Sequence, residues 1–322
     1  MNDLPTPRFI VGTGRCGSTL LSQMLGENPE LLSIHEILVG IGEHFRFKRE
    51  PVSGSELAQQ LRMDSPLMTI AHRQGIKTST FSYPVDRPNM RYKLEDPVPW
   101  ILSLALPYMT DDPDKLFDDL IEQVESYPTQ SLSLHYQLFL GWMTEHLGKQ
   151  YWIERSGASM GYLSELIEFF PGAKVLHLHR DGRDAATSMQ ALPILRAAGA
   201  LSEGEPAVSG EQGIIELLTT DIPIEILGRY WSNQILAGLE VIPQIAPANF
   251  LQVRFEDLVL DTRATLEHIA EFFEIGEGDW IDRAAAHSRG IPASRYPDLS
   301  AAQQMALNDA CREVMHRLDR NC

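Results

Sequence analysis

A glycine-rich turn near the N-terminus, set between an apolar strand and an amphipathic helix, is the feature that most constrains the fold. Within residues 9–21, Gly12, Gly14 and Gly17 allow the backbone to wrap closely around a ligand. The amides at the start of the helix that follows point at the same place and favour an anion. The stretch therefore predicts a phosphate cradle at the carboxyl end of a strand.

The same turn departs from the loop of nucleoside triphosphatases. Gly12 and Gly17 have the P-loop spacing, but Ser18 stands where those enzymes need a lysine. The cation lies instead inside the loop, at Arg15. The cradle is therefore suited to a terminal group other than a magnesium-bound triphosphate.

A second strand, tight turn and helix start covers residues 175–189 and contains Arg180, Arg183 and Ser188. Taken alone, its charged turn is equally well read as a solvated surface turn with local ion pairs. Beside the first motif, it favours a second anion contact. His177 and His179 alternate on this strand, and packing is a better interpretation of them than metal ligation.

Strands and helices alternate along much of the chain, which predicts an α/β fold with a P-loop-like parallel sheet flanked by helices. We expect strands at 8–12, 32–35, 151–154, 174–179 and 250–254. We expect helices at 18–27, 159–170, 182–191, 224–242, 263–273, 279–286 and 300–318.

Residues from about 37 to 150 break this alternation. The stretch has Pro-rich joints and helical patterns near 98–109, 114–125 and 131–147. We interpret it as a long helical insertion within one domain over residues 1–322. Residues 199–213, rich in Gly, Ser, Glu and Pro, are the best candidate for a mobile surface loop or lid.

Composition limits the classes of partner. The formal charge of −17 argues against a nucleic-acid binder, which would need a basic stripe. No apolar run is long enough to cross a bilayer, and the first residues do not resemble a signal peptide. Cys16, Cys311 and Cys322 have no metal-ligand spacing and fit a reducing compartment. We therefore expect a cytoplasmic protein without a membrane span, whose oligomeric state the sequence leaves open.

The two motifs together resemble the sulfotransferases that use 3′-phosphoadenosine 5′-phosphosulfate (PAPS), in motif order closest to the tyrosylprotein-type and bacterial members. Residues 15–21 look like the family's 5′-phosphosulfate loop, and residues 175–189 are similar to its 3′-phosphate segment. The resemblance implies PAPS as cofactor, with product PAP and no metal. The cofactor-binding residues that it implies in these two motifs are Gly14, Arg15, Cys16, Gly17, Ser18, Thr19, Arg180 and Ser188.

Three further stretches match the family in order. Arg155 stands where the family often has a lysine that contacts the transferring sulfuryl group, although Gly157 replaces the usual proline. Phe255, in Val253–Leu258, takes the aromatic place near the adenine. Arg295 resembles the basic residue of the segment that closes on the cofactor. The resemblance covers residues 8–36 and 151–319, so the unmatched middle is expected to shape the acceptor pocket.

In-line sulfuryl transfer needs a base for the acceptor proton and positive charge at the leaving oxygen. The resemblance gives Arg15 and Arg155 the charge-stabilising roles, and it matches Glu36 to the catalytic glutamate of the tyrosylprotein enzymes. His35 is the competing base. The other interpretation is that Glu36 caps the next helix while His35 packs beneath the loop.

The expected function is transfer of a sulfuryl group to an acceptor hydroxyl on a small molecule, a polyketide or other carrier-bound compound, a lipid or a glycan. Two alternatives from other classes stay open. A P-loop kinase or NTPase would bind Mg²⁺ at residues 12–19, although the lysine is absent. A non-catalytic nucleotide-binding regulator would keep Arg180 and Ser188 without needing Arg15 or a base.

Overall fold

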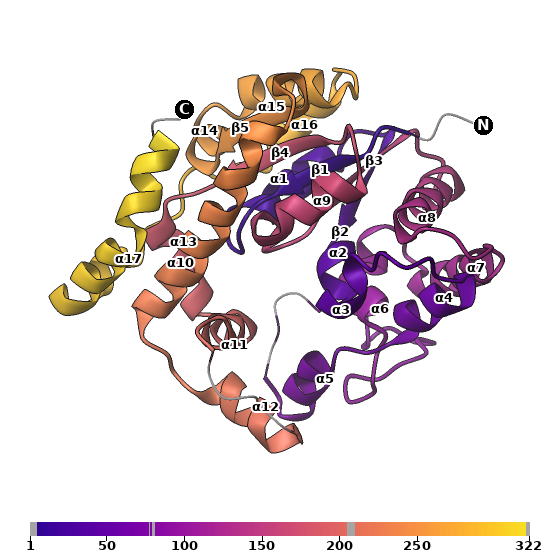
Figure 1. The fold of residues 1–322 in the computed structure, drawn as a ribbon, viewed down its shortest axis with the longest axis horizontal. Helices are drawn as coiled ribbons and strands as arrows, with labels where there is room; N and C mark the ends of the chain where they lie inside the picture. The colour runs from indigo at the N-terminus through magenta and orange to yellow at the C-terminus, as the bar shows by residue number, and fades with distance from the viewer. Residues whose placement is uncertain (1–4, 77, 79–80, 205–209, 320–322) are drawn as a thin grey trace.

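The computed structural model describes residues 5–76, 78, 81–204 and 210–319, and its centre is a five-stranded sheet in the order β2-β3-β1-β4-β5 (Figure 1). All neighbouring strands pair in parallel, so their carboxyl ends lie at one edge. The predicted α/β class is confirmed. The strands are β1 (Arg8–Val11), β2 (Leu31–His35), β3 (Tyr151–Arg155), β4 (Lys174–His179) and β5 (Phe250–Arg254).

Both faces of this sheet are covered by helices, and for that reason its strands read as apolar runs rather than alternating patterns. Phe9 of β1 pairs in register with Val175 of β4 and packs edge-on against Trp152 of β3 in the larger core. The next residue, Ile10, pairs with Leu176 and packs into a second core on the opposite face. Successive side chains of a strand therefore point into the two cores in turn, one on each face of the sheet.

The helices outside the insertion include all those expected from the sequence, with three additions. The structure adds α11, α12 and α14, of which α14 begins directly at the end of β5. These helices are α1 (Ser18–Leu25), α9 (Leu163–Phe169), α10 (Gly182–Gln190), α11 (Pro193–Ser202), α12 (Gly210–Thr219), α13 (Ile224–Val241), α14 (Phe255–Leu260), α15 (Thr262–Phe273), α16 (Trp280–Ala285) and α17 (Ala301–Asp319).

The insertion is helical, as predicted, and the helical pattern near 98–109 forms two short pieces. Helix α6 ends at Leu104, and a short 3-10 turn follows at Leu106–Tyr108, because Pro107 lacks the amide that a continuing helix would need. The helices of the insertion are α2 (Ile37–Gly40), α3 (Glu43–Arg46), α4 (Gly54–Arg62), α5 (Pro66–Arg73), α6 (Trp100–Leu104), α7 (Pro113–Glu125) and α8 (Leu132–His146).

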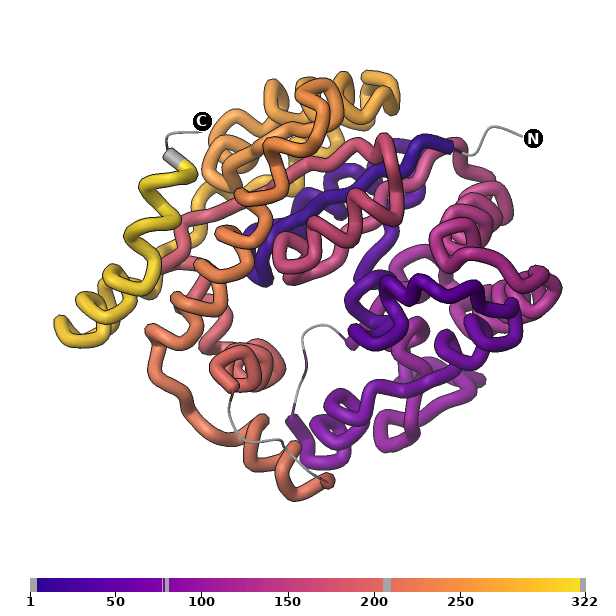
Figure 2. The backbone as a smooth tube through the Cα atoms, in the orientation of Figure 1, coloured from indigo at the N-terminus to yellow at the C-terminus, as the bar shows by residue number. Residues whose placement is uncertain are grey.

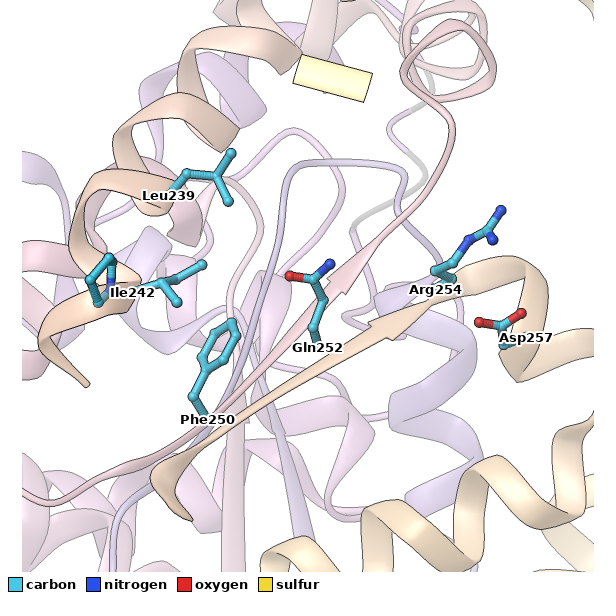
Figure 3. Close-up of a pocket in the computed structure, with 7 residues that line it drawn as sticks. Leu239, Ile242, Phe250, Gln252, Arg254 and Asp257 are labelled. Carbon is cyan, nitrogen blue, oxygen red and sulfur yellow. The ribbon is translucent and has the colours of Figure 1, made fainter. Parts of the chain in front are cut away.

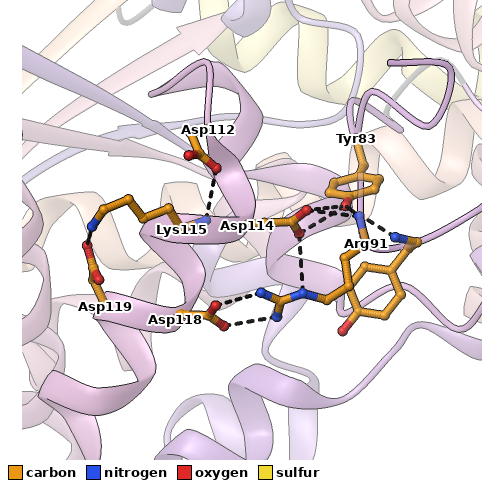
Figure 4. Close-up of polar contacts among 8 residues, drawn as sticks. Tyr83, Arg91, Asp112, Asp114, Lys115, Asp118 and Asp119 are labelled. Carbon is orange, nitrogen blue, oxygen red and sulfur yellow. Dashed lines mark hydrogen bonds and ion pairs between the residues drawn. The ribbon is translucent and has the colours of Figure 1, made fainter. Parts of the chain in front are cut away.

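A polar network holds the loop before α6 against α7 (Figure 4). The Tyr83 hydroxyl donates to the carboxylate of Asp114 at 2.8 Å, and Arg91 forms a two-pronged ion pair with Asp118 at 2.9 and 2.6 Å. Burial and the Asp114 contact raise the pKa of Tyr83 to about 12. The loop is thereby fixed without regular secondary structure.

The segment predicted as a mobile loop or lid is partly helical. Helix α11 continues through Ser202 and α12 begins at Gly210, while residues 205–209 lie outside the described residues. Helix α12 lies beside α5 of the insertion (Figure 2), where Ala71, Ala197 and Leu218 form a small buried cluster. The α11–α12 pair therefore connects the sheet region to the insertion.

Two further sequence expectations concern the cysteines and the membrane. Cys16 and Cys311 are free and buried, and Cys322 lies outside the described residues. Over the part of the chain that the structure describes, none of the helices combines the length and apolar character needed to span a bilayer.

Candidate functional site

The turn after β1 owes its shape to two residues with left-handed backbone, Arg15 with φ 65° and Gly17 with φ 96°. A Cβ added to Gly17 would lie 2.2 Å from the ring of Phe255, so only glycine fits there. A Cβ on Gly12 would lie 2.7 Å from the Cys16 sulfur. No side chain caps α1, which leaves its first amides available to a ligand.

The other predicted loop residues lie at different depths. Cys16 is fully buried, burial raises the pKa of its thiol, and the thiol lies inside the turn against Gly12 and Ser18. Gly14 is half-buried beneath Leu195 of α11. Ser18 and Thr19 are the first two residues of α1. Ser18 is half-buried and Thr19 is exposed, and the hydroxyls of both can reach a ligand at the helix start.

Arg15 joins the two predicted motifs. Its Nε donates to the Ser188 hydroxyl of α10 at 2.9 Å, across a separation of 173 residues. Burial, followed by the charges of Arg180 and Arg295, lowers the pKa of Arg15. We call Arg15, Ser188, Arg180 and Arg295 the arginine cluster. It concentrates positive charge in a chain whose net charge is strongly negative.

Arg180 follows β4 and has unused donor capacity. Its guanidinium lies 4.9 Å from the ring centroid of Phe255, and its Nη2 is 3.6 Å from an Asp184 oxygen. Its Nε is buried without a hydrogen-bond partner. Because buried donors are almost always paired, this orphan favours an anionic ligand at Arg180. Phe255 is only 4% exposed, so it supports Arg180 and leaves little open ring.

The segment that carries Arg295 is anchored to α10 by contacts that the sequence reasoning missed. The Ser294 hydroxyl donates to Asp184, the same carboxylate that faces Arg180. The guanidinium of Arg183 lies 5.2 Å from the ring centroid of Tyr296. Arg295 is thereby kept beside the other members of the arginine cluster.

A second group forms where β2 and β3 end side by side, with His35 paired in register to Arg155. One Nη of Arg155 contacts Glu36 Oε1, and the other lies 2.8 Å from His35 Nδ1. The second oxygen of Glu36 accepts the amide of Gly157 at 2.8 Å. We call His35, Glu36 and Arg155 the Glu36 cluster. Its carboxylate and guanidinium balance each other in charge.

The ring of His35 is held neutral. A guanidinium can only donate, so Nδ1 accepts from Arg155 and Nε2 carries the proton that it donates to Ser22 Oγ, 2.9 Å away. Burial and the charge of Arg155 lower the pKa of His35 to about 3. Tyr108 stacks on the ring at a centroid distance of 4.3 Å. Both nitrogens are therefore occupied, whereas the Glu36 carboxylate keeps part of its surface open.

Sequence reasoning missed the residues that support both clusters: Ser22, Tyr108, Glu154, Ser156, Asp184 and Ser294. Most of these are ordinary polar residues whose roles depend on distant partners. Glu154 is the exception, because a carboxylate inside the apolar strand of residues 151–154 is itself a signal.

A pocket of about 620 Å³ lies along the outer strand β5 and the end of α13 (Figure 3). Phe250, Gln252 and Arg254 alternate along the strand and line it on one side, with Leu239 and Ile242 opposite. It contains none of the predicted site residues. The two clusters, and not this pocket, are the candidate site.

A family model described as "Sulfotransferase family" matches residues 7–279, well over half of the chain. No curated protein matches the chain. The family match spans the glycine-rich turn, the insertion and the Arg180 segment together. It ends before the segment that carries Arg295.

Solved structures are similar to the chain over nearly its full length. The sulfotransferase domain from the curacin biosynthetic pathway aligns with a TM-score of 0.55 at 16% identity, covering 98% of each chain. The sulfotransferase domain of the Synechococcus PCC 7002 olefin synthase aligns at 0.50 and 16%, covering 96% of this chain and 89% of that one. Sulfotransferase STF9 from Mycobacterium avium aligns at 0.50 and 15%, covering 98% and 77%. At these identities the similarity shows the fold.

Proposed function

The chain belongs to the sulfotransferase family, and we propose that it moves a sulfuryl group from PAPS to an acceptor hydroxyl. The observation that carries the assignment of PAPS is the arginine cluster. The charges of Arg180 and Arg295 both lower the pKa of Arg15, and the Nε of Arg180 is buried without a partner. An anionic ligand would offset the repulsion between the arginines and would give the Arg180 guanidinium an acceptor.

The residues present fit PAPS. The amides at the start of α1, with Ser18, Thr19 and Arg15, would hold the 5′ end, while Arg180 and Ser188 would hold the 3′-phosphate. Gly14, Cys16 and Gly17 contribute backbone, Phe255 supports Arg180, and Arg295 closes on the ligand from the C-terminal segment. PAPS supplies the sulfuryl group, and PAP leaves.

Glu36 takes the acceptor proton in this proposal. The acceptor oxygen forms its bond to sulfur as the bond from sulfur to the bridging phosphate oxygen breaks, and the proton passes to Glu36. Arg155 orients the Glu36 carboxylate and would stabilise the growing charge on the sulfuryl oxygens, while Arg15 would stabilise the leaving oxygen. His35 positions Arg155, because it is neutral and engaged at both nitrogens.

We propose one domain over residues 1–322, in which the insertion shapes the acceptor pocket. Its α2 lies directly after Glu36, and a Cβ on Gly40 would collide with Trp100 of α6, so the two helices are in close contact. Tyr108, half exposed beside His35, also comes from the insertion. The acceptor is a small molecule, lipid, glycan or carrier-bound compound.

The test combines binding and turnover. Calorimetry should show tight binding of PAP, weaker binding of adenosine 5′-phosphosulfate, which lacks the 3′-phosphate, and no preference for ATP with Mg²⁺. Mass spectrometry of an extract incubated with PAPS and the protein should then detect products that gain a sulfuryl group. Preferential ATP binding would favour the kinase class, and PAP binding without any transfer would favour a regulator.

A further inference from the structure

Helix α2 begins at the proposed base, yet that residue does not cap it. Glu36 occupies the N-cap position with φ 56°, and its side chain makes no capping hydrogen bond. Both carboxylate oxygens are directed elsewhere, to Arg155 and to the Gly157 amide. The first amides of α2 therefore need acceptors from another part of the chain.

Two buried side chains at the end of β3 supply them. The Leu38 amide donates to Glu154 Oε1 at 3.2 Å, and the Val39 amide donates to Ser156 Oγ at 3.1 Å. The Ser156 hydroxyl in turn donates to the same Glu154 oxygen at 2.5 Å. Glu154 is 1% exposed, so the two bonds that its carboxylate accepts are shielded from water.

The same set of bonds continues to the glycine-rich turn. The Ser159 hydroxyl donates to the Ser156 carbonyl at 2.7 Å and accepts the Gly12 amide at 3.1 Å. Gly12 is the first residue of the turn that follows β1. A continuous path of buried hydrogen bonds thus links the start of α2 to the cradle.

A carboxyl group in this place costs stability. Burial raises the pKa of Glu154 to about 7, the negative charge of Glu36 acts in the same direction, and Arg155 opposes it. Arg46, Tyr136 and Tyr162 face the same buried space. Since an apolar residue would be the more stable choice inside a strand, the carboxyl is explained by the acceptors that it provides.

We propose that Glu154 is a positioning residue, which together with Ser156 caps α2 from outside, so that the Glu36 carboxylate is not needed as the cap and can accept a proton. The inference rests on the proposed role of Glu36. The cap holds the turn at residue 36 in place, because α2 starts there and is only one turn long. Glu154 acts through Glu36 and does not touch the substrate.

A double-mutant cycle tests this dependence, with single-turnover consumption of PAPS, water serving as acceptor, as the readout. Glu154→Met removes the acceptor at nearly constant volume and should lower the rate about tenfold. In a Glu36→Gln background, the same change should lower the rate by less than about twofold. Glu154→Gln, whose carbonyl can still accept both hydrogen bonds, should stay near the wild-type rate. PAP affinity should be unchanged in every variant.

Hydrogen exchange of the Leu38 and Val39 amides tests the cap without turnover. Both should be protected in the wild type and in Glu154→Gln, and both should exchange faster in Glu154→Met. If Glu154→Met does not fold, Ser156→Ala replaces it in both measurements, with loss of protection at Val39.

Three outcomes would overturn the inference: equal amide protection in all variants, an equal loss of rate in both Glu36 backgrounds, or a Glu154→Gln variant as slow as Glu154→Met. Failure of the proposed function looks different. In that case the wild type would bind PAP without consuming PAPS, or Glu36→Gln would keep full rate, while the exchange experiment would still decide whether Glu154 caps α2.

Discussion

The arginine cluster and the Glu36 cluster lie at the same edge of the sheet but differ in net charge. Arg15, Arg180 and Arg295 put three cations together, with Asp184 as a partial counter-charge to Arg180. In the Glu36 cluster, one carboxylate faces one guanidinium, and a neutral histidine completes the set. The arginine cluster carries surplus positive charge, whereas the Glu36 cluster is balanced in charge, although the Nε of Arg155, like that of Arg180, is buried without a hydrogen-bond partner.

This difference in net charge predicts that one cluster controls ligand affinity and the other controls the reaction rate. A site with surplus positive charge gains stability when an anionic ligand arrives, so its residues should control affinity. A charge-balanced site has little to gain from an anionic ligand, so its residues should control the rate once the ligand is bound. Variants of the two clusters should therefore fail in different assays.

Glu36→Gln should give the largest effect. The change keeps the shape and removes the proton acceptor, so the single-turnover rate should fall about 10²-fold or more. PAP affinity, measured by calorimetry, should stay within about twofold of the wild type. Glu43→Gln, at an exposed position of α3, is the matched control. A variant that keeps its rate while His35→Ala is inactive would transfer the role of base to His35.

Arg180→Ala should do the reverse and weaken PAP binding by about 1.5–3 kcal/mol, the worth of a charge-assisted contact. Calorimetry with PAP and with adenosine 5′-phosphosulfate measures the effect, and only the first ligand should lose affinity. Arg229→Ala removes an arginine of α13 that pairs with Glu203, at the end of α11, and controls for loss of charge alone. Equal losses for both ligands would remove Arg180 from the 3′-phosphate contact.

The neutral state of His35 should appear as a pH dependence of stability. Its pKa in the folded protein is about 3, below the ordinary value of 6.5, so only the unfolded chain takes up this proton as the pH falls below 6.5. The stability associated with neutral His35 is present above pH 6.5 and is lost on acidification. By pH 5.5 the wild type should lose about 1 kcal/mol more than His35→Asn, measured by urea unfolding.

Asn is the chosen replacement at position 35 because its carbonyl can still accept from Arg155. His44→Asn, at an exposed position of α3, controls for loss of a histidine. Parallel pH profiles for the wild type and His35→Asn would mean that His35 gains a proton in the folded protein, and the charge balance of the Glu36 cluster would have to be revised.

The smallest expected effect is that of a metal chelator on the turnover of PAPS. The charges that face the ligand are those of arginines, so turnover of PAPS should be the same with and without EDTA. Activity measured after dialysis, with and without added Mg²⁺, checks this. A loss in EDTA that Mg²⁺ restores would place the positive charge on an ion and move the protein towards the kinase class.

Much of the sheet region could be predicted from the sequence, and less of the insertion. The five strands and the helices that follow them have apolar runs, glycine turns and polar faces that report local structure. In the insertion, α3, α4 and α5 were missed, and the helical pattern near 98–109 is divided into α6, which ends at Leu104, and a 3-10 turn that contains Pro107. Short helices there are decided by packing and by networks such as Tyr83–Asp114, which local patterns do not show.

By itself, the sequence determined the strand–turn–helix units, because a glycine that must take positive φ and an apolar run beside it are local requirements. Only the tertiary structure decided which side chains meet. The contacts between Arg15 and Ser188 and between Arg155 and Glu36 span 173 and 119 residues. They exist because parallel register brings the carboxyl ends of β1–β4 to one edge. The external cap of Glu154 on α2 depends on that same register, so no spacing along the chain could reveal it.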